Sequence, residues 1–307
     1  MNEFELIARL TRSLPANDSV VAGPGDDCAV LDLGLPGQWL LFKTDAVVEG
    51  VHFTPDTPPE KIGHKALGRC LSDIAAMAGT AIAAVITIGV PKRFSAEAIE
   101  KIYEGLNTLA QAHSVAVVGG ETTANPGPLF LSVALLGTVA RQKAVFRSGA
   151  KAGDGIFVTG DLGGSRAGKH LDFEPRLAEG RWLAGHFPIH AMIDLSDGLA
   201  GDLRHILKAS GVGAEILKSA VPISRAAKQR SAQKPPFSAA LTDGEDFELL
   251  FTVASRQAVP LLDAWKKEFP GLKLSCIGKI VSGGGLVIRD RNRSQELDIR
   301  GYEHFAS

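Results

Sequence analysis

The chain has 307 residues, of which 45% are hydrophobic and 22% are charged, and its formal net charge at pH 7 is −1. This length is sufficient for two domains with separate cores. Because no Lys/Arg-rich stripe dominates the sequence, we expect no nucleic-acid partner. The most basic stretch, residues 225–234, runs into Pro235-Pro236 and is predicted to be a solvated loop.

The cysteine pattern and the N-terminus indicate a reducing compartment. The three cysteines, Cys28, Cys70 and Cys276, are widely spaced and odd in number, which argues against a disulfide framework and against a zinc site. Glu3 and Glu5 occupy positions where a signal peptide carries bases. No apolar run reaches the ~20 residues needed to cross a bilayer. We therefore expect a cytoplasmic protein with no membrane partner.

Hydrophobic periodicity predicts alternating strands and helices in the first half of the chain. The expected strands are residues 28–33, 39–42, 81–90, 115–118 and 129–139, and the expected helices are residues 61–78 and a second helix capped by Ser95. Apolar residues recur at four-residue spacing in the first helix, at Ile62, Ala66, Cys70 and Ile74. The apolar face of the second helix consists of Ile99, Ile102, Tyr103, Leu106 and Leu109.

A segment rich in Gly and charge, residues 141–154, predicts a domain boundary. We expect an N-terminal domain of residues 1–145 and a C-terminal domain of residues 146–307. The expected strands of the second domain are residues 156–159, 192–195, 247–253, and a closing pair at 274–281 and 286–288; its helices are 176–186, 199–209 and 258–269. The alternation predicts two α/β domains in sequence.

One glycine-rich segment has the spacing of a P-loop. It is Gly163-Gly164-Ser165-Arg166-Ala167-Gly168-Lys169-His170, and it follows the predicted strand 156–159. Its last position is His170, whereas a P-loop needs Ser or Thr there to bind Mg²⁺. We therefore interpret the segment as a flexible glycine turn that leads into a helix.

Acidic residues recur beside glycines or hydroxyl residues at the predicted ends of apolar runs. The segments are Gly25-Asp26-Asp27, Thr44-Asp45, Ser72-Asp73, Gly119-Gly120-Glu121, Asp194-Leu195-Ser196-Asp197-Gly198 and Gly244-Glu245-Asp246. Unpaired carboxylates ~4 Å apart would repel by roughly 4 kcal/mol at an effective dielectric constant near 20. Because strand ends cluster at one edge of an α/β sheet, we expect these side chains to converge and to hold Mg²⁺ against phosphate oxygens.

Taken singly, several of these acids have structural explanations. The turn at residues 25–27 can be an acidic surface turn, and Asp45 can be a strand-end cap. Asp73 lies near the apolar stripe of its helix, where a carboxylate is costly unless it is paired. An ion pair with Arg69, four residues earlier, would satisfy it.

The segment 194–198 has a similar alternative. Ser196 or Asp197 can be the N-cap of the helix that follows. That explanation covers one of the two residues and leaves Asp194 unexplained. The glycines before Glu121 would also let backbone N–H groups approach a phosphate closely.

Motifs along nearly the whole chain match those of one known family. They are Phe4-Glu5-Leu6-Ile7, Gly25-Asp26-Asp27-Cys28-Ala29, Thr44-Asp45 with His52-Phe53, Leu71-Ser72-Asp73-Ile74-Ala75-Ala76-Met77, Arg147-Ser148-Gly149-Ala150, Asp194-Leu195-Ser196-Asp197-Gly198-Leu199, Gly244-Glu245-Asp246-Phe247-Glu248-Leu249 and Gly301-Tyr302-Glu303-His304-Phe305. The chain thereby resembles thiamine-monophosphate kinases of the PurM-like ATP-binding superfamily. The first and the last two motifs distinguish this family within the superfamily.

The resemblance implies a PurM-like two-domain fold of the α/β (α+β) class, with an N-terminal domain that forms a dimeric β-barrel with helices outside and a C-terminal α/β domain. It implies a homodimer whose active sites lie between the two domains. It also implies ATP-dependent phosphorylation of thiamine monophosphate to thiamine diphosphate. ATP would be the co-substrate and several Mg²⁺ ions the cofactors.

The resemblance further implies roles for individual residues. The metal site would comprise Asp27, Thr44, Asp45, Asp73, Glu121, Asp194 and Asp197, with Lys43 directly beside Thr44 and Asp45. ATP would contact Tyr103, Gly120, Glu121, Arg147 and Ser196, and thiamine monophosphate would contact His52, Glu245 and Tyr302. Because a phosphate monoester is already ionised at neutral pH, we expect no general base and no covalent intermediate. Tyr103 can instead be a core residue, and His52 a loop residue.

Two positions depart from the family pattern. Glu121 stands where Asp is usual, and Lys43 stands where a smaller polar residue is common. These departures motivate the alternative of a catalytically silent binder of thiamine phosphates. Another alternative is a different superfamily enzyme. Selenophosphate synthetases need an N-terminal Cys or Sec and hydrogenase-maturation proteins a C-terminal Cys, and this sequence has neither; purine-biosynthesis cyclo-ligases are a further possibility.

Overall fold

A computed structural model of the chain describes residues 3–291 and 293–297. The helices are α1 (Glu3–Thr11), α2 (Pro59–Ala76), α3 (Ala96–Ala112), α4 (Lys169–Asp172), α5 (Leu177–His186), α6 (Leu199–Ser210), α7 (Arg225–Gln229), α8 (Pro236–Thr242) and α9 (Ala258–Glu268), with 3-10 turns η1 (Ser165–Ala167), η2 (Lys218–Ala220) and η3 (Ser255–Gln257). The strands are β1 (Val20–Ala22), β2 (Ala29–Leu31), β3 (Gln38–Val48), β4 (Thr80–Val90), β5 (Ala116–Ala124), β6 (Phe130–Ala140), β7 (Asp154–Thr159), β8 (Ile189–Asp194), β9 (Gly213–Leu217), β10 (Leu249–Ala254), β11 (Leu274–Val281), β12 (Leu286–Asp290) and β13 (Arg293–Glu296).

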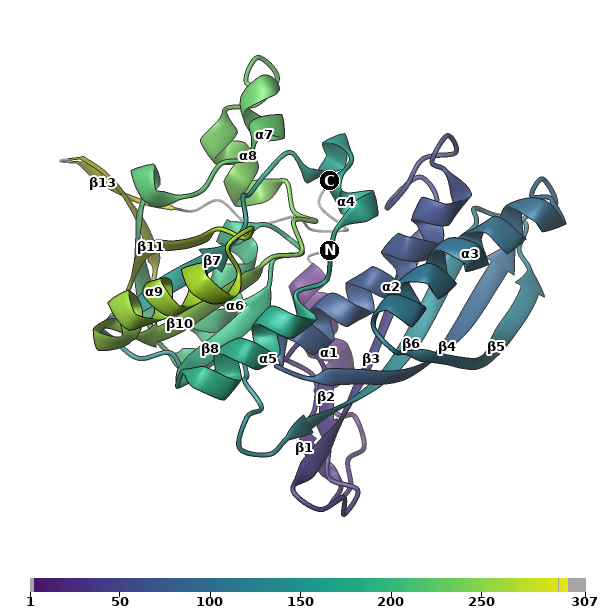
Figure 1. Ribbon diagram of the computed structural model, residues 1–307, viewed down its shortest axis with the longest axis horizontal. Helices are drawn as coiled ribbons and strands as arrows, with labels where there is room; N and C mark the ends of the chain where they lie inside the picture. Colours follow the sequence, from purple (N-terminus) through teal and green to yellow (C-terminus); the bar gives the residue numbers. More distant parts are fainter. Residues whose placement is uncertain (1–2, 292, 298–307) are drawn as a thin grey trace.

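The N-terminal half is one twisted sheet with two long helices on one face (Figure 1). The strand order is β1-β2-β3-β6-β4-β5. Helices α2 and α3 pack against each other and cover one face of the sheet. They bury the side chains that alternate residues of a strand direct toward them, such as Leu131, Val133 and Leu135 of β6. Ser95 caps α3 as predicted, because its side chain accepts a hydrogen bond from Ala98 N at 3.2 Å.

The opposite face of this sheet is apolar and exposed. Large hydrophobic side chains on its central and edge strands remain accessible, namely Phe42, Ile82, Val85, Val118 and Leu136. Phe42 of β3 pairs directly with Leu136 of β6, so their side chains share this face. Exposed apolar patches of this kind commonly mark an interaction surface or a ligand-binding groove.

The C-terminal half is a second sheet with helices on both faces. Its strand order is β13-β12-β9-β11-β7-β10-β8. Helices α5 and α9 cover the face that carries Phe157 and Phe251, whose rings stack at 5.5 Å between centroids. Helices α6 and α8 cover the other face and form a separate core. The core under α5 and α9 is continuous with the core of the N-terminal half. Helix α2 lies at the junction, against α5 and β8 (Figure 1).

Most strand pairs are antiparallel. Among the described residues, β4–β5 and β9–β12 are parallel and the other pairs are antiparallel, so the sheets are mixed, in agreement with the expected α/β (α+β) class. The predicted closing pair is wrong, because β12 pairs with β9 and β13 and not with β11. Local periodicity predicts a strand but carries no information about its partner.

Two predicted strand ends are also wrong. Strand β3 continues to Val48, so Thr44 and Asp45 lie inside it, and β5 continues through Gly119 and Gly120 to Ala124, so Glu121 lies inside that strand. Polar residues and glycines ended the predicted strands, but long-range pairing with neighbouring strands continues them. The predicted loop at residues 225–234 begins with helix α7, which Ser224 caps through a 3.0 Å hydrogen bond from Ala227 N.

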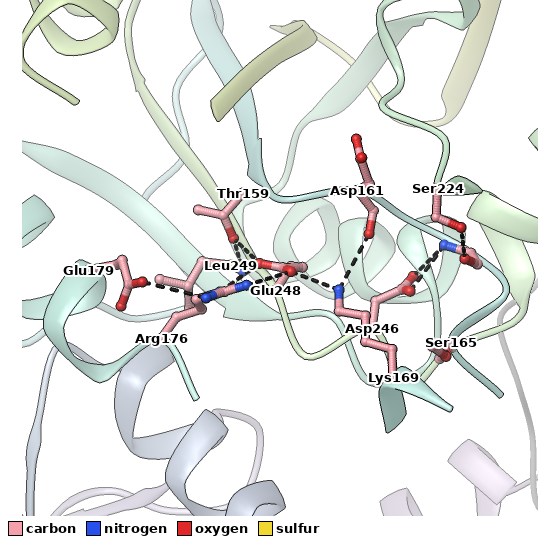
Figure 2. A network of polar contacts seen from close by, with 12 residues as sticks. Thr159, Asp161, Ser165, Lys169, Arg176, Glu179, Ser224, Asp246, Glu248 and Leu249 are labelled. Carbon is pink, nitrogen blue, oxygen red and sulfur yellow. Dashed lines mark hydrogen bonds and ion pairs between the residues drawn. The ribbon is translucent and has the colours of Figure 1, made fainter. Parts of the chain in front are cut away.

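A buried polar network fixes the segment that precedes β10 (Figure 2). Glu248 is 1% exposed. Its carboxylate accepts two hydrogen bonds from Arg176, both at 2.8 Å, one from Lys169 at 2.7 Å and one from the hydroxyl of Thr159 at 2.7 Å. Buried charges are tolerated when they are paired and fully hydrogen-bonded in this way.

The same network shows why the glycine-rich segment 163–170 does not act as a P-loop. Lys169, which would be the phosphate-binding lysine of a P-loop, forms its ion pair with Glu248. Gly163 donates its backbone N–H to both carboxylate oxygens of Asp246 at 3.0 Å (Figure 2). The segment is thus a structural turn that leads into η1 and α4, in agreement with our interpretation. Among the described helices, none combines the length and the apolar composition that a membrane span requires.

Substitution of Gly105 by alanine should destabilise the protein. A Cβ atom at Gly105 in α3 would lie 1.8 Å from the carbonyl oxygen of Glu60 at the start of α2. Since backbone cannot yield as a flexible side chain can, we expect Gly105→Ala to lower the free energy of unfolding by about 2–3 kcal/mol, measured by urea denaturation. The control is Gly185→Ala in α5, where a Cβ meets nothing within 4 Å; equal losses in both variants would contradict this prediction.

Asp246 should make stability depend on pH. Burial raises the pKa of Asp246 from 3.8 to about 7, although Lys169 opposes the shift. The folded state therefore holds a proton that the unfolded state has released, so this residue costs stability as the pH rises from about 4 to about 7. Asp246→Asn should consequently stabilise the protein more at pH 8 than at pH 5 in thermal melts. A difference that does not change with pH would contradict the prediction.

Candidate functional site

Three buried aspartates from distant parts of the chain meet between the two halves. Asp27 precedes β2, Asp73 lies within α2, and Asp194 is the last residue of β8. One carboxylate oxygen of each lies within 4.8 Å of the others. The structure thus brings together three of the predicted metal ligands, which we call the aspartate cluster.

Each member of the aspartate cluster has its own polar partner. Arg147 donates to Asp27 Oδ1 from Nη2 at 2.6 Å and from Nε at 3.2 Å. Lys43 Nζ donates to Asp73 Oδ1 at 2.9 Å, and the Ser72 hydroxyl donates to Asp194 Oδ2 at 2.6 Å. The expected pair of Asp73 with Arg69 is therefore replaced by a pair with Lys43.

Burial makes ionisation of the cluster unfavourable. It raises the pKa of Asp73 well above its ordinary value, although Lys43 opposes the shift. Burial, followed by the charge of Asp27, raises the pKa of Asp194 to about 7. Crowded carboxylates in a buried position need additional positive charge or protons to remain together.

A hard divalent cation fits this donor set. Mg²⁺ prefers carboxylate oxygens and retains several waters, so two or three converging carboxylates suit it. Asp27 is only 1% exposed, and its Oδ2 atom has no hydrogen-bond partner among the described residues. This buried oxygen is therefore available to coordinate a cation.

The remaining predicted metal ligands are placed differently. Asp45 lies next to the cluster, 3.9 Å from Lys43 Nζ and 3.6 Å from Arg69 Nε. Thr44 faces the other side of β3, where its hydroxyl lies 3.4 Å from that of Ser132. Glu121 is exposed on β5 and does not belong to the aspartate cluster.

A polar cavity lies beside the cluster. It is lined by Val51, His52, Arg69, Arg166, Ser196, Asp197, Asp243, Glu245 and Phe247. Arg69 is one helical turn from Asp73 on α2, and Asp197 is three residues from Asp194. Four of the predicted site residues therefore line one cavity that adjoins the predicted metal site.

Glu245 in this cavity is held by basic residues from both halves. Its Oε1 atom lies 2.5 Å from the Nζ of Lys65, which is completely buried in α2, and its Oε2 atom lies 3.2 Å from His170 Nδ1 and 3.7 Å from Arg166 Nε. Although burial opposes ionisation, His170 and Lys65 lower the pKa of Glu245 to about 2. Lys65 also donates to the backbone carbonyl of His52 at 2.6 Å, so His52 and Glu245 are linked through one ammonium group.

The residues expected to contact ATP have structural partners of their own. Arg147 pairs with Asp27. A Cβ at Gly120 would lie 1.8 Å from the carbonyl oxygen of Ile86, so glycine is required for the approach of β5 to β4. Tyr103 is half-buried and packs against the hydrophobic core. Tyr302, which was expected to contact thiamine monophosphate, lies outside the described residues.

Sequence reasoning missed several residues of the site. Ser72 was named only as the neighbour of Asp73, with no role of its own. Lys65 was not singled out, although Lys65, Arg69 and Asp73 recur at four-residue spacing, which places them on one face of α2. Asp202 was also missed. It is 2% exposed, and its carboxylate accepts a hydrogen bond from Asp197 N at 3.1 Å. An acid in the first turn of a predicted helix was its only signal.

Comparison with family models places both halves of the chain in one group. The family described as AIR synthase related protein, N-terminal domain, matches residues 25–139. The family described as AIR synthase related protein, C-terminal domain, matches residues 160–291.

Solved structures share the fold. AaThiL complexed with AMPPCP and TMP superimposes with a TM-score of 0.82 and 29% identity, over 99% of this chain and 97% of that one. Thiamine-monophosphate kinase from Stenotrophomonas maltophilia K279a gives a TM-score of 0.76 and 33% identity, over 93% and 96%. The hydrogenase maturation protein HypE of E. coli, at 21% identity and a TM-score of 0.75, is similar in fold alone.

Curated relatives extend the similarity over the full chain. Thiamine-monophosphate kinase of Rhodopirellula baltica is 38% identical, over 90% of this chain and 87% of its own length. The enzyme of the same name from Escherichia coli K12 is 36% identical, over 99% of this chain and 98% of its own length. With this identity over nearly its whole length, and with the two-domain PurM-like fold, the chain belongs to the thiamine-monophosphate kinase family.

Proposed function

We propose that this chain transfers the γ-phosphoryl group of ATP to the phosphate of thiamine monophosphate, forming ADP and thiamine diphosphate, with Mg²⁺ as cofactor. The observation that carries the proposal is the meeting of Asp27, Asp73 and Asp194 within 4.8 Å in a member of this family. Further support comes from the relative that was solved with AMPPCP and TMP.

The aspartate cluster would hold Mg²⁺ through Asp27, Asp73 and Asp194, with Asp45 beside it. When bound, Mg²⁺ would supply positive charge to the phosphate oxygens that otherwise repel each other. Asp197 lines the adjoining cavity and would extend this set. We assign no ligand geometry to Thr44 and Glu121, which lie away from the cluster; their roles remain predictions.

The polar cavity would hold thiamine monophosphate. Arg69 and Arg166 line it and would attract and orient the acceptor phosphate, since guanidinium groups match phosphate oxygens. Glu245, whose carboxylate is ionised at neutral pH, would face the cationic thiazolium ring, and His52 and Tyr302 would complete the contacts. The catalytic contribution of the chain is then to orient two phosphates and exclude water, because the acceptor oxygen is already anionic.

The nucleotide would be contacted by Arg147, Ser196, Gly120, Tyr103 and Glu121. Arg147 already lies against Asp27, so a phosphate held by this guanidinium would lie next to the cluster. Ser196 is two residues from Asp194 and lines the cavity. These assignments follow the family and extend from the cluster toward β5.

We further propose a homodimer in which the exposed apolar face of the N-terminal sheet meets its copy, so that the two sheets close into a barrel. A self-complementary apolar face suits a two-fold symmetric interface. We place the domain boundary at residues 145/146, within the segment between β6 and β7 that contains no helix or strand. A cytoplasmic location agrees with the free cysteines Cys28, Cys70 and Cys276, and cell fractionation would test it.

The assay for the proposed reaction is Mg²⁺-dependent ADP release with thiamine monophosphate, compared with free thiamine and with no acceptor. We expect turnover with thiamine monophosphate only, and thiamine diphosphate as product by chromatography. Turnover with free thiamine alone would refute the assignment of the acceptor. Tight binding of thiamine monophosphate without ADP release would instead identify a silent binder.

Asp73→Asn should abolish this activity while the fold is retained. The amide preserves the size of the side chain but removes one negative charge from the cluster, and loss of a preorganised electrostatic group typically costs about 100-fold or more in kcat. Circular dichroism would verify the fold. A rate within a few-fold of the parent would exclude Asp73 from the metal site.

In the same assay, Glu121→Asp should retain or raise activity, because Asp is the usual residue of the family at this position. A large loss would show that the site has adapted to Glu121.

Val118→Asp should disrupt the proposed dimer. Val118 is 64% exposed on β5, and a charge there would be buried without a partner in the interface. We expect a shift from dimer to monomer in light scattering coupled to size exclusion. Val259→Asp is the matched control, because Val259 is 68% exposed on α9 of the other half; a monomeric parent protein would refute the dimer.

A further inference from the structure

Lys43 lies in an unusual place for a lysine. It extends from β3 toward α2, and its Nζ atom is 2.9 Å from Asp73 Oδ1 and 3.9 Å from Asp45 Oδ1. Its side chain is 21% exposed. A single ammonium group thus bridges a member of the aspartate cluster and the neighbouring carboxylate.

Three of four carboxylates at the cluster have a basic partner without any metal. Four carboxylates gather there, those of Asp27, Asp45, Asp73 and Asp194. Arg147 pairs with Asp27 and Arg69 pairs with Asp45. Lys43 is the basic residue that pairs directly with Asp73. Within residues 3–291 and 293–297, Asp194 forms no ion pair within 4 Å and relies on the Ser72 hydroxyl.

The ammonium group acts on two members of the cluster, because it pairs with Asp73 and its charge also opposes the rise in the pKa of Asp194. A cation bound at ~2.1 Å from the Asp73 oxygen would lie within a few ångströms of the Lys43 nitrogen and would repel it. Lys43 and a divalent cation therefore repel each other at Asp73, whichever of its two carboxylate oxygens the cation takes. A small polar residue at position 43 would impose no such competition.

We propose that Lys43 is a resident counterion of the aspartate cluster, which stabilises the metal-free protein and competes with Mg²⁺ for Asp73. The proposal rests on the metal site described under the proposed function, but it does not depend on the identity of the phosphoryl acceptor. It predicts that this chain tolerates metal depletion and binds Mg²⁺ more weakly at this site than it would without the lysine.

The experiment measures Mg²⁺ binding by calorimetry and thermal stability in EDTA and in Mg²⁺, with no nucleotide present. Lys43→Met keeps the length of the side chain and removes its charge. We expect the Kd for Mg²⁺ to fall about tenfold, and the Tm in EDTA to fall by about 2–4 °C and to be restored by Mg²⁺. Lys61→Met is the matched control, since Lys61 pairs with Asp172 at 2.6 Å on the surface; its Kd for Mg²⁺ should not change.

The outcomes separate the competing explanations. An unchanged or weaker Mg²⁺ affinity in Lys43→Met, with a Tm loss that Mg²⁺ does not restore, would show a merely structural ion pair and overturn the proposal. A variant that folds only with Mg²⁺ would support it. If Lys43→Met does not fold at all, Lys43→Ser is read by the same criteria.

Failure of the metal site itself has a different signature. No Mg²⁺ binding by the parent and by either variant would refute both the site and the proposal. Mg²⁺ binding that the substitution leaves unchanged would refute the proposal alone. The kinase assignment is judged separately, by ADP release.

Discussion

The mutual repulsion of three buried carboxylates is the constraint on which the site depends. Asp27, Asp73 and Asp194 come within 4.8 Å of one another, and the chain offsets their charge in three ways. Arg147 forms a two-pronged contact with Asp27, Lys43 forms an ion pair with Asp73, and the Ser72 hydroxyl donates to Asp194. Because hydrogen bonds and ion pairs can hold such a cluster together only where every partner is fixed, the fold must place these partners firmly, and the interior of the molecule is built accordingly.

Helix α2 places most of them, because it presents two different stripes. Ile62, Ala66, Cys70 and Ile74 are buried in the core. Lys65, Arg69 and Asp73, each one residue before one of the last three of these, form the polar stripe that faces the site. Close contacts hold the helix in position on two sides. A Cβ at Gly63 would lie 1.8 Å from the Ile102 carbonyl oxygen, and one at Gly180 would lie 2.2 Å from that of Ala75. Any shift of α2 would therefore move the core and the polar stripe together.

The sequence predicted the elements of this arrangement better than their assembly. The Ser95 cap and helices α2, α3, α6 and α9 follow from local periodicity, and the acidic segments identified the aspartate cluster. The reason given for their convergence was partly wrong, since Asp45 and Glu121 lie inside strands and the sheets are largely antiparallel. Strand partners such as β3 and β6 are about ninety residues apart in register (Thr44 with Ala134), and no local pattern encodes that pairing. Lys43 and Lys65 show the same limit, because the sequence reveals a lysine but not the carboxylate it meets.

The contacts that build the site also join the two halves of the molecule. Ser72 with Asp194, Arg147 with Asp27 and Lys65 with Glu245 each connect residues on opposite sides of the junction. Glu245 adopts a left-handed backbone conformation, with φ of 56°, and the neighbouring Glu248 network holds this strained segment in place. A ligand that withdrew Glu245 from Lys65, or a cation that withdrew Asp73 from Lys43, would thus alter a contact between or within the halves. Since the paired charges are buried, breaking one contact without replacing it is costly, so phosphate and metal can enter only by supplying compensating charges. Under the proposed function, a ligand with both a cationic ring and an anionic phosphate would suit this exchange, because it would carry a partner for the carboxylate and a partner for the released basic group.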